Sequence, residues 1–399
     1  MEIERRICLV EVVSFMWAYV LSFLGSTLCV YSAEKINSKE VQRILLLLAI
    51  LITSLLAAFR ALSIGTDVLN YVQPMFINAQ KANNFSEYLN SPILSDWSLV
   101  PVSSFEYGYT IIVFICAKLF GNIFSLLFIT QFVIIGCVLI GLWRQRKELL
   151  VSLGIFSYYF LFYNTSLNMV RQSIAMAILF MAFSYLRNRK IITYFILMII
   201  ATLFHRTAII GIIIFLLYMS FYRNSRTVRL GNNLSLNTKT IKLIFIGIIS
   251  FTIVFIPSIF QIVLKLLGIS QYAEGYITNK IHFSLNGSLV CLAIILIVIL
   301  CWDAVNNDKL KYLYMGLLIC DLATVQLTTA STYASRISLY FMMFYVYIVP
   351  TFLCRITDRK RKLALVIYIL LLCLYWYYTI VYLKYNDTIP YVIAPNFNF

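Results

Sequence analysis

Long apolar runs alternate with short polar intervals from one end of the chain to the other. The runs are about 15–22 residues long, close to the roughly 20 that cross a bilayer as an α-helix. The polar intervals are too short to hold a soluble domain. This pattern predicts an all-α, polytopic transmembrane helix bundle of about 12–13 spans. It also predicts one integral membrane domain over residues 1–399.

The predicted spans follow the apolar runs directly. They lie near residues 9–31, 44–60, 106–120, 122–143, 149–164, 169–186, 190–204, 207–222, 241–257, 285–302, 309–330, 336–354 and 363–384. The run at 9–31 is too long for a signal-peptide core and lacks an A-x-A-like cleavage site, so we interpret it as a span.

The composition agrees with this pattern, and the positions of the basic residues explain the net charge. The chain is 62% apolar and 12% charged, with a net charge of +16. Six loops (33–43, 144–148, 187–190, 223–242, 303–311 and 355–362) hold 21 of the 32 Lys and Arg residues. Basic loops mark the cytoplasmic side of a membrane protein. The positive charge therefore indicates topology, and we expect no nucleic-acid partner.

From residue 122 onward the basic loops fall on alternate turns, which places residues 164–171, 205–206 and 336 on the outer face. The first third of the chain is less regular. We interpret loop 33–43 as cytoplasmic, loop 61–105 as external and segment 106–120 as re-entrant. In the alternative, 106–120 is a true span and loop 61–105 lies inside. Arg60 and Asp67 would then be far from Arg171.

The segment 168–206 is predicted to be a helical hairpin whose two outer ends meet. Asn168, Arg171 and Gln172 stand at one end, and His205-Arg206 at the other. Arg171 offers a planar fork for phosphate oxygens, and a neutral His is a natural proton acceptor. The structural alternatives are an arginine that snorkels to the headgroups and a histidine that anchors the helix at the interface.

Polar residues at the end of the second predicted span form another candidate cluster. It contains Arg60, Gly65, Thr66, Asp67 and Tyr71. Gly65 permits a tight turn, and Asp67 is placed to cap a short helix that begins near residue 68. The structural alternative is a helix exit with an interfacial arginine and a capping aspartate.

Two further clusters complete the candidates. Glu106 and Tyr107 open an apolar run, where tyrosines can stack on sugar faces or form an interfacial belt. A hydroxyl-rich bend at 328–335 ends in Arg336, with a plain polar turn as the alternative. Arginines at outer helix ends, beside carboxylates and a histidine, suit an anionic, sugar-bearing lipid.

Several other chemistries are not expected. The chain has two His residues, no close pair of acids, no CxxC pair and no Walker or Rossmann glycine motif. We therefore predict no metal site and no cofactor. The nine Cys lie mostly within apolar runs and indicate no disulfide framework.

At these clusters the sequence resembles the EpsG-like family of Wzy-type polysaccharide polymerases. The matching pieces are Arg60…Gly65-Thr66-Asp67…Tyr71, Glu106-Tyr107-Gly108-Tyr109, Asn168–Ala175, Phe204–Ala208 and Arg336. The resemblance covers residues 45–355 and implies an enzyme of the bacterial inner membrane with its active site on the outer face. Its substrate would be an undecaprenyl-pyrophosphate-linked oligosaccharide, polymerised into O-antigen, capsule or exopolysaccharide.

On this hypothesis Arg171, Arg336 and Arg60 hold the pyrophosphate, and His205, Asp67 or Glu106 removes the acceptor proton. The remaining candidates for substrate binding are Gly65, Thr66, Tyr71, Tyr107, Asn168, Gln172 and Arg206. The lipid bilayer, a chain-length regulator and a flippase are the expected partners. The alternatives are a flippase or transporter for the same units, or a related lipid-linked glycosyltransferase or ligase.

Overall fold

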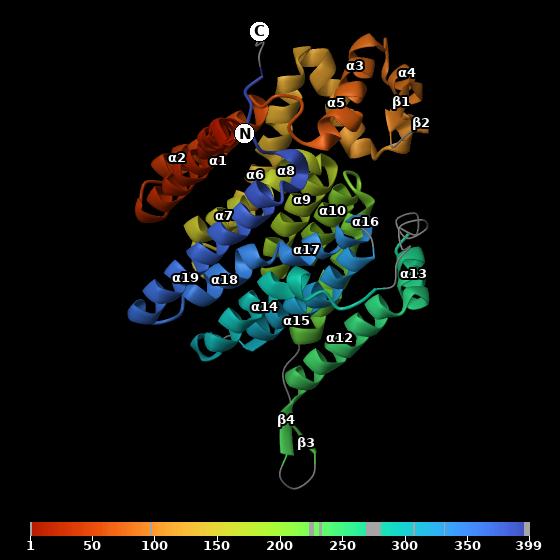
Figure 1. Ribbon diagram of the computed structural model, residues 1–399. Coiled ribbons are helices and arrows are strands. Elements are labelled where there is room, and N and C mark those ends of the chain that lie inside the picture. Colours follow the sequence, from red (N-terminus) through yellow and green to blue (C-terminus); the bar gives the residue numbers. More distant parts are fainter. Residues whose placement is uncertain are drawn as a thin grey trace. The chain divides into compact units, whose positions relative to one another are not determined.

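The computed structural model describes residues 2–95, 98–222, 227–230, 234–268, 281–305, 308–330 and 332–394. These residues form two compact units, one made of residues 1–206 and 366–399 and the other of residues 207–365. Figure 1 shows the helices and strands of both units.

The first unit is built from helices and one small hairpin. Its α-helices are α1 (Glu2–Lys35), α2 (Lys39–Ala58), α3 (Gln73–Lys81), α4 (Phe85–Asn90), α5 (Tyr107–Phe120), α6 (Ile123–Trp143), α7 (Val151–Tyr158), α8 (Asn164–Asn168), α9 (Val170–Arg187), α10 (Ile191–Thr202) and most of α19 (Asp358–Trp376). Wider π-helical turns are η1 (Val68–Val72), η3 (Tyr159–Tyr163) and η8 (Tyr377–Tyr382). Strands β1 (Pro92–Ser95) and β2 (Ser98–Pro101) pair antiparallel. The 3₁₀ turns are η2 (Val102–Ser104) and η9 (Tyr385–Asp387).

The second unit is also helical. It contains α11 (Gly211–Tyr222), α12 (Thr238–Phe255), α13 (Pro257–Leu266), α14 (Leu285–Leu300), α15 (Asp308–Thr324), α16 (Thr332–Ser335), α17 (Ser338–Met342) and α18 (Tyr345–Leu353). Strands β3 (Thr227–Leu230) and β4 (Leu234–Asn237) form an antiparallel hairpin. The 3₁₀ turns are η4 (Arg206–Ile210), which begins at the last residue of the first unit, η6 (Trp302–Ala304) and η7 (Val325–Thr329).

The predicted all-α polytopic bundle is confirmed. Among the described residues, six helices are long and apolar enough to cross a membrane, at Met16–Lys35, Lys39–Ala58, Ile123–Trp143, Thr238–Phe255, Lys309–Thr329 and Lys360–Tyr382. Shorter apolar helices accompany them. Large apolar side chains such as Ile192, Leu300 and Leu370 are exposed on these helices, as expected of surfaces that face lipid.

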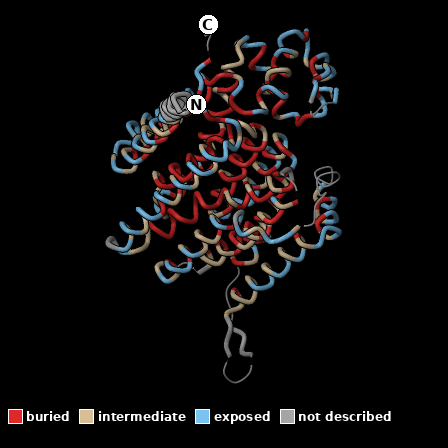
Figure 2. The backbone as a smooth tube through the Cα atoms, viewed as in Figure 1, coloured by how far each residue is buried: buried red, intermediate tan, exposed pale blue. Residues whose placement is uncertain are grey.

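Buried residues of the first unit concentrate on α7 and α9 (Figure 2). Nearly every side chain of α9 beyond Arg171 is buried, so this helix lies at the centre of the unit. Helices α6 and α10 pack directly against it. The chain breaks its helical path at Met169 (φ −82°, ψ 66°), between α8 and α9. This break places Asn168 and Arg171, both half-buried, at one end of the central helix.

Basic residues gather at the opposite end of the same helices. Arg144 Nε donates to Ser184 Oγ at 3.1 Å, Arg187 pairs with Glu148, and Glu34 accepts from the backbone of Val151 at 2.7 Å. Loop 33–43 therefore lies with loops 144–148 and 187–190, as predicted from the charges. Since α9 has 18 residues, the two ends lie about 27 Å apart.

The segment 61–120 differs from a plain loop followed by a span. Residues 68–90 form η1, α3 and α4, and residues 92–101 form a hairpin. Helix α5 has 14 residues, fewer than the roughly 20 that a span needs. It packs against these elements, because the centre of the Phe114 ring lies 5.3 Å from that of Phe85 and 5.5 Å from that of Tyr88. The segment forms a small helical layer at the end of the unit opposite loops 33–43, 144–148 and 187–190. We call this the non-basic end.

Candidate functional site

Arg171 stands at the centre of a polar cluster at the non-basic end of the first unit. Its guanidinium forms an ion pair with Glu106, which opens α5. The guanidinium carbon also lies 4.7 Å from the centres of both the Tyr71 and Phe105 rings. The side chain of Arg171 remains 21% exposed, whereas that of Glu106 is 7% exposed. The aromatic rings and the carboxylate fix the orientation of the guanidinium, and its exposed part remains accessible to a ligand.

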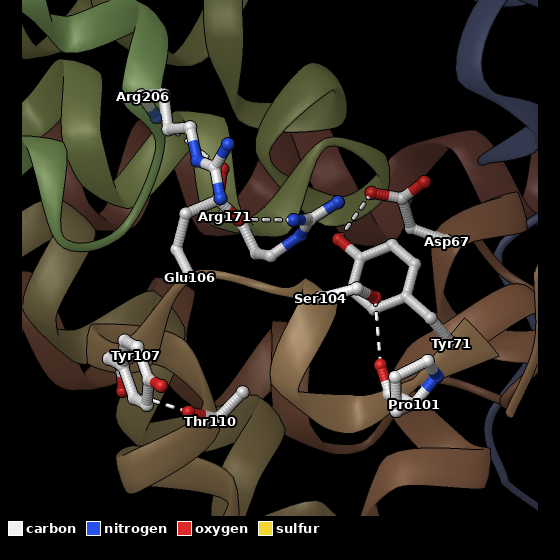
Figure 3. Close-up of polar contacts among 9 residues, drawn as sticks. All are labelled: Asp67, Tyr71, Pro101, Ser104, Glu106, Tyr107, Thr110, Arg171 and Arg206. Atoms are coloured by element: carbon white, nitrogen blue, oxygen red, sulfur yellow. Dashed lines mark hydrogen bonds and ion pairs between the residues drawn. The ribbon is translucent and has the colours of Figure 1, made fainter. Parts of the chain in front are cut away.

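Glu106 connects α5 to both ends of the α9–α10 hairpin (Figure 3). One carboxylate oxygen pairs with Arg171, and the other accepts from the backbone N–H of Arg206 at 3.4 Å. Burial would raise the pKa of the Glu106 carboxyl, but the nearby Arg171 and His205 outweigh burial, and the pKa is lowered. Glu106 is therefore ionised at neutral pH, which stabilises the positive charge of Arg171.

Gly108 makes this connection sterically possible. Its N–H donates to the Leu203 carbonyl at 2.8 Å, just before His205-Arg206. A Cβ atom at position 108 would lie 2.7 Å from that oxygen, so only glycine fits without a shift. The predicted meeting of Arg171 with His205-Arg206 is thus observed within this unit. His205 itself is 6% exposed.

Asp67 lies on the other side of the Arg171 guanidinium. Tyr71 donates its hydroxyl to Asp67 Oδ2 at 2.6 Å, and Asp67 interacts electrostatically with Arg171. Burial, followed by the charge of Asp67, raises the pKa of Tyr71 above its ordinary value, so the phenol keeps its proton. Asp67 is half-buried and therefore more accessible than Glu106. Figure 3 shows the order Arg206, Glu106, Arg171, Tyr71 and Asp67.

Asn168 fixes the turn that carries Asp67. Its side-chain oxygen accepts from the Thr66 hydroxyl at 2.9 Å and from the Asp67 N–H at 3.1 Å. Gly65 approaches the same region with φ 85°, and a Cβ there would lie 2.5 Å from the Leu167 oxygen. The sequence prediction that loop 61–67 and the start of α9 come together is confirmed by these contacts. The alternative that separated Arg60 and Asp67 from Arg171 is excluded.

The other predicted residues take different places. Arg60 is 2% exposed and donates to the carbonyls of Ala57 and Leu167, both at 3.1 Å, which favours a bracing role over contact with substrate. Gln172 is buried, and Tyr107 is 54% exposed beside Glu106. Arg336 belongs to the second unit, so its predicted convergence with Arg171 stays a prediction.

Two parts of this cluster were not predicted from the sequence. Phe105 contacts the guanidinium of Arg171, and its position directly before Glu106 was the available signal. The C-terminal residues 385–394 pair with residues 59–65, more than 300 positions earlier. No periodicity or motif in either segment indicates that pairing.

Among the described residues, no three His, Cys, Asp or Glu side chains are grouped so that they could hold a metal ion. The cluster instead offers two arginines, two carboxylates, a histidine and aromatic rings. Such groups can bind an anion and accept a proton beside it.

The fold and this cluster define a polytopic helical membrane protein with a charged site at one end of its helices. The model of the EpsG family matches residues 43–393, so the chain belongs to the EpsG family. Members of this family are Wzy-like polymerases, which places the chain in polysaccharide biosynthesis. No curated protein matches the chain. No solved structure matches it either.

Proposed function

We propose that the protein polymerises undecaprenyl-pyrophosphate-linked oligosaccharide units into O-antigen, capsule or exopolysaccharide at the outer face of the bacterial inner membrane. The observation that carries the proposal is the cluster in which Arg171 lies between Glu106 and the Tyr71–Asp67 pair. It combines a fixed, accessible cation with a half-buried carboxylate at the end of the helices opposite the basic loops.

In the proposed reaction, a sugar hydroxyl oxygen of the incoming unit attacks the anomeric carbon of the growing chain. The bond from that carbon to the pyrophosphate oxygen breaks, and its electron pair leaves with the polyprenyl pyrophosphate. Negative charge grows on the leaving oxygen. Arg171 would stabilise it with N–H donors that are already in position, a contribution of about 3 kcal/mol.

Asp67 is the proposed base for the acceptor hydroxyl. Glu106 is buried, and Arg171 and His205 lower the pKa of its carboxyl. We therefore assign Glu106 the role of orienting Arg171 and not that of a proton acceptor. His205 is only 6% exposed, so it is less accessible to an acceptor hydroxyl than Asp67. Asp67 is half-buried, and the hydrogen bond from Tyr71 at 2.6 Å fixes the direction of its carboxylate.

Arg336 enters the proposal on its sequence position alone. It belongs to the second unit, whereas the Arg171 cluster lies in the first. Arg206, Thr66 and Tyr107 stand at the edge of the Arg171 cluster and are proposed to contact the sugars or the pyrophosphate. A chain-length regulator and a flippase are the partners that such a polymerase would need.

Complementation of a polymerase-deficient strain, with glycan laddering on a gel, tests this function. A polymerase restores a ladder, whereas its loss leaves single exported units. A flippase would leave units inside the cell when lost, and a ligase would leave polymer on its lipid. Failure to restore a ladder in any strain whose repeat unit is made and exported would contradict the proposal.

A further inference from the structure

The C-terminal segment folds back onto the site and contacts it at several points. The backbone of residues 392–394 pairs with that of 59–61, with Ala61 N donating to Val392 O at 2.7 Å and Ala394 N to Phe59 O at 3.0 Å. Further along the turn, Gly65 N donates to Asp387 O at 3.2 Å. All of these residues belong to the first unit.

The side chain of Asn386 forms the most direct of these contacts. Its oxygen accepts from Asn168 Nδ2 at 3.3 Å, and its Nδ2 donates to Thr165 Oγ1 at 3.3 Å. Asn168 in turn accepts from Thr66 and from the Asp67 N–H. The Asp67 N–H requires the Asn168 oxygen on its side, and the Asn386 oxygen accepts from the Asn168 nitrogen, so both ends of the amide are held. Asn386 therefore acts on Asp67 through Asn168.

The backbone at Asn386 supports the same interpretation. Asn386 has φ 70°, and its neighbours Lys384 and Asp387 have φ 53° and 47°. Residues other than glycine rarely adopt such angles, and asparagine is among those that tolerate them. A run of such conformations persists where surrounding contacts determine it, and it is common near functional sites. Here those contacts are the hydrogen bonds to Asn168, Thr165 and Gly65.

We propose that Asn386 is a positioning residue for glycosyl transfer. It holds the Asn168 amide, and through it the Asp67 carboxylate, at the distance from the acceptor hydroxyl that proton removal requires. This inference rests on the proposed function, since it assigns the role of Asn386 through Asp67. It makes the C-terminal segment part of the site and not merely its cover.

The test compares three variants of the full-length protein, purified and reconstituted with a polyprenyl-pyrophosphate-linked oligosaccharide. Asn386→Gly removes the amide but suits φ 70°, so it separates the side chain from backbone strain. Asn386→Asp keeps an oxygen that can accept from Asn168 and also tolerates this φ. Lys384→Gly is the matched control, at φ 53° with an exposed side chain two residues away.

We expect Asn386→Gly to lower kcat by roughly 10- to 100-fold, because a small misplacement of a reacting group has this effect. KM should stay within about twofold, since the base acts only in the transition state. Asn386→Asp should recover most of the lost kcat, and Lys384→Gly should match the wild type. A merely structural role would instead change the amount of folded protein and leave kcat per folded molecule unchanged.

Wild-type kcat in Asn386→Gly would overturn the inference, as would a change in KM alone or an equal loss in Asn386→Asp. If Asn386→Gly is not recovered from membranes, Thr165→Val replaces it. That variant removes the hydroxyl that accepts from Asn386 while keeping its shape, and wild-type kcat there would also overturn the inference. Asp67→Asn in the same assay separates the two proposals. If Asp67→Asn is active, the proposed base is wrong. If only Asp67→Asn is inactive, the positioning role is wrong.

Discussion

At the residue scale, the site depends on how Arg171 is held. Its guanidinium contacts two aromatic rings and a carboxylate that belong to segments 65 and 100 positions away in sequence. An ammonium group could supply the charge but not the planar fork that fits a carboxylate on one side and phosphate oxygens on the other. The proposed role of Arg171 therefore depends on the geometry of its guanidinium and not only on its charge.

Arg171→Lys should reduce polymer formation at least tenfold while the protein still reaches the membrane. Laddering in the complemented strain, with immunoblotting for protein level, measures this. Arg146→Lys is the matched control, because Arg146 is exposed at the basic end and should be replaceable there. A normal ladder from Arg171→Lys would mean that a point charge is sufficient.

Because of Glu106, we expect the stability of the folded protein to decrease at acid pH. Its folded pKa lies below the usual value of about 4.3, so ionised Glu106 stabilises the folded state above that pH. This contribution is lost as the pH falls through the folded pKa. We expect the Tm of the purified protein in detergent to fall as the pH is lowered below about 4. This fall should be steeper for the wild type than for Glu106→Gln.

The same substitution has a cost at neutral pH. Glu106→Gln removes the carboxylate that forms the ion pair with the largely buried Arg171, which should destabilise the protein by about 3 kcal/mol. Identical Tm values for Glu106→Gln and wild type at pH 7 would contradict the ion pair as described.

At the scale of elements, the site forms where three chain breaks meet. The turn at Gly65, the interruption at Met169 between α8 and α9, and the start of α5 after Glu106 all lie at the non-basic end of the first unit. Each break exposes main-chain groups that a continuous helix would satisfy, and the side chains of Asn168 and Arg60 bind some of them.

Gly65→Ala tests the closeness of this meeting. The substitution adds a Cβ at φ 85° and within 2.5 Å of the Leu167 oxygen, so it should destabilise the protein by about 2 kcal/mol or more and abolish the ladder. Gly121→Ala is the control, since Gly121 has φ 64° with nothing within 4 Å of an added Cβ. Equal effects of the two would show that only backbone strain matters, and not the contact with α8.

The helices of the bundle were predictable because apolar runs of fixed length identify spans. The elements at 68–101 were not, because α3 and α4 are short and mostly polar on their outer faces. Met75, Phe76 and Ala79 are buried at helical spacing and were the one signal available. Helix α13 follows the predicted span at 241–257 and begins at Pro257, a residue well suited to the first turn of a helix.

The residues of the site were predictable for a related reason. A charged residue at the end of an apolar run stands out against its neighbours, as Arg171 and Glu106 do. The pairing between residues 59–61 and 392–394 depends on main-chain groups and leaves no such mark. For the same reason, the sequence did not reveal that Arg60 is enclosed by carbonyl groups instead of facing a substrate.

At the scale of the whole molecule, the distribution of charge is the basis for the orientation that we propose in the membrane. In the first unit, basic residues lie at one end of α6 and α9, and the Arg171 cluster lies at the other. By the positive-inside rule we propose that the cluster faces away from the cytoplasm. This orientation agrees with an enzyme whose lipid-linked substrate has already crossed the membrane.

Cysteine labelling in intact cells tests this orientation. In a background without the native cysteines, Thr66→Cys should react with a membrane-impermeant maleimide from outside, and Lys147→Cys should react only after the membrane is opened. Both positions are exposed, so each should label once reagent reaches it. Labelling of Lys147→Cys in intact cells would reverse the topology.

The most direct test of the central claim is chain extension by the purified protein in liposomes with a polyprenyl-pyrophosphate-linked oligosaccharide as the only substrate. We predict that wild-type protein lengthens the glycan and releases polyprenyl pyrophosphate in equal steps, and that Arg171→Ala and Asp67→Asn do neither at the same protein level. Wild-type extension by Arg171→Ala would contradict the assignment of this cluster as the active site.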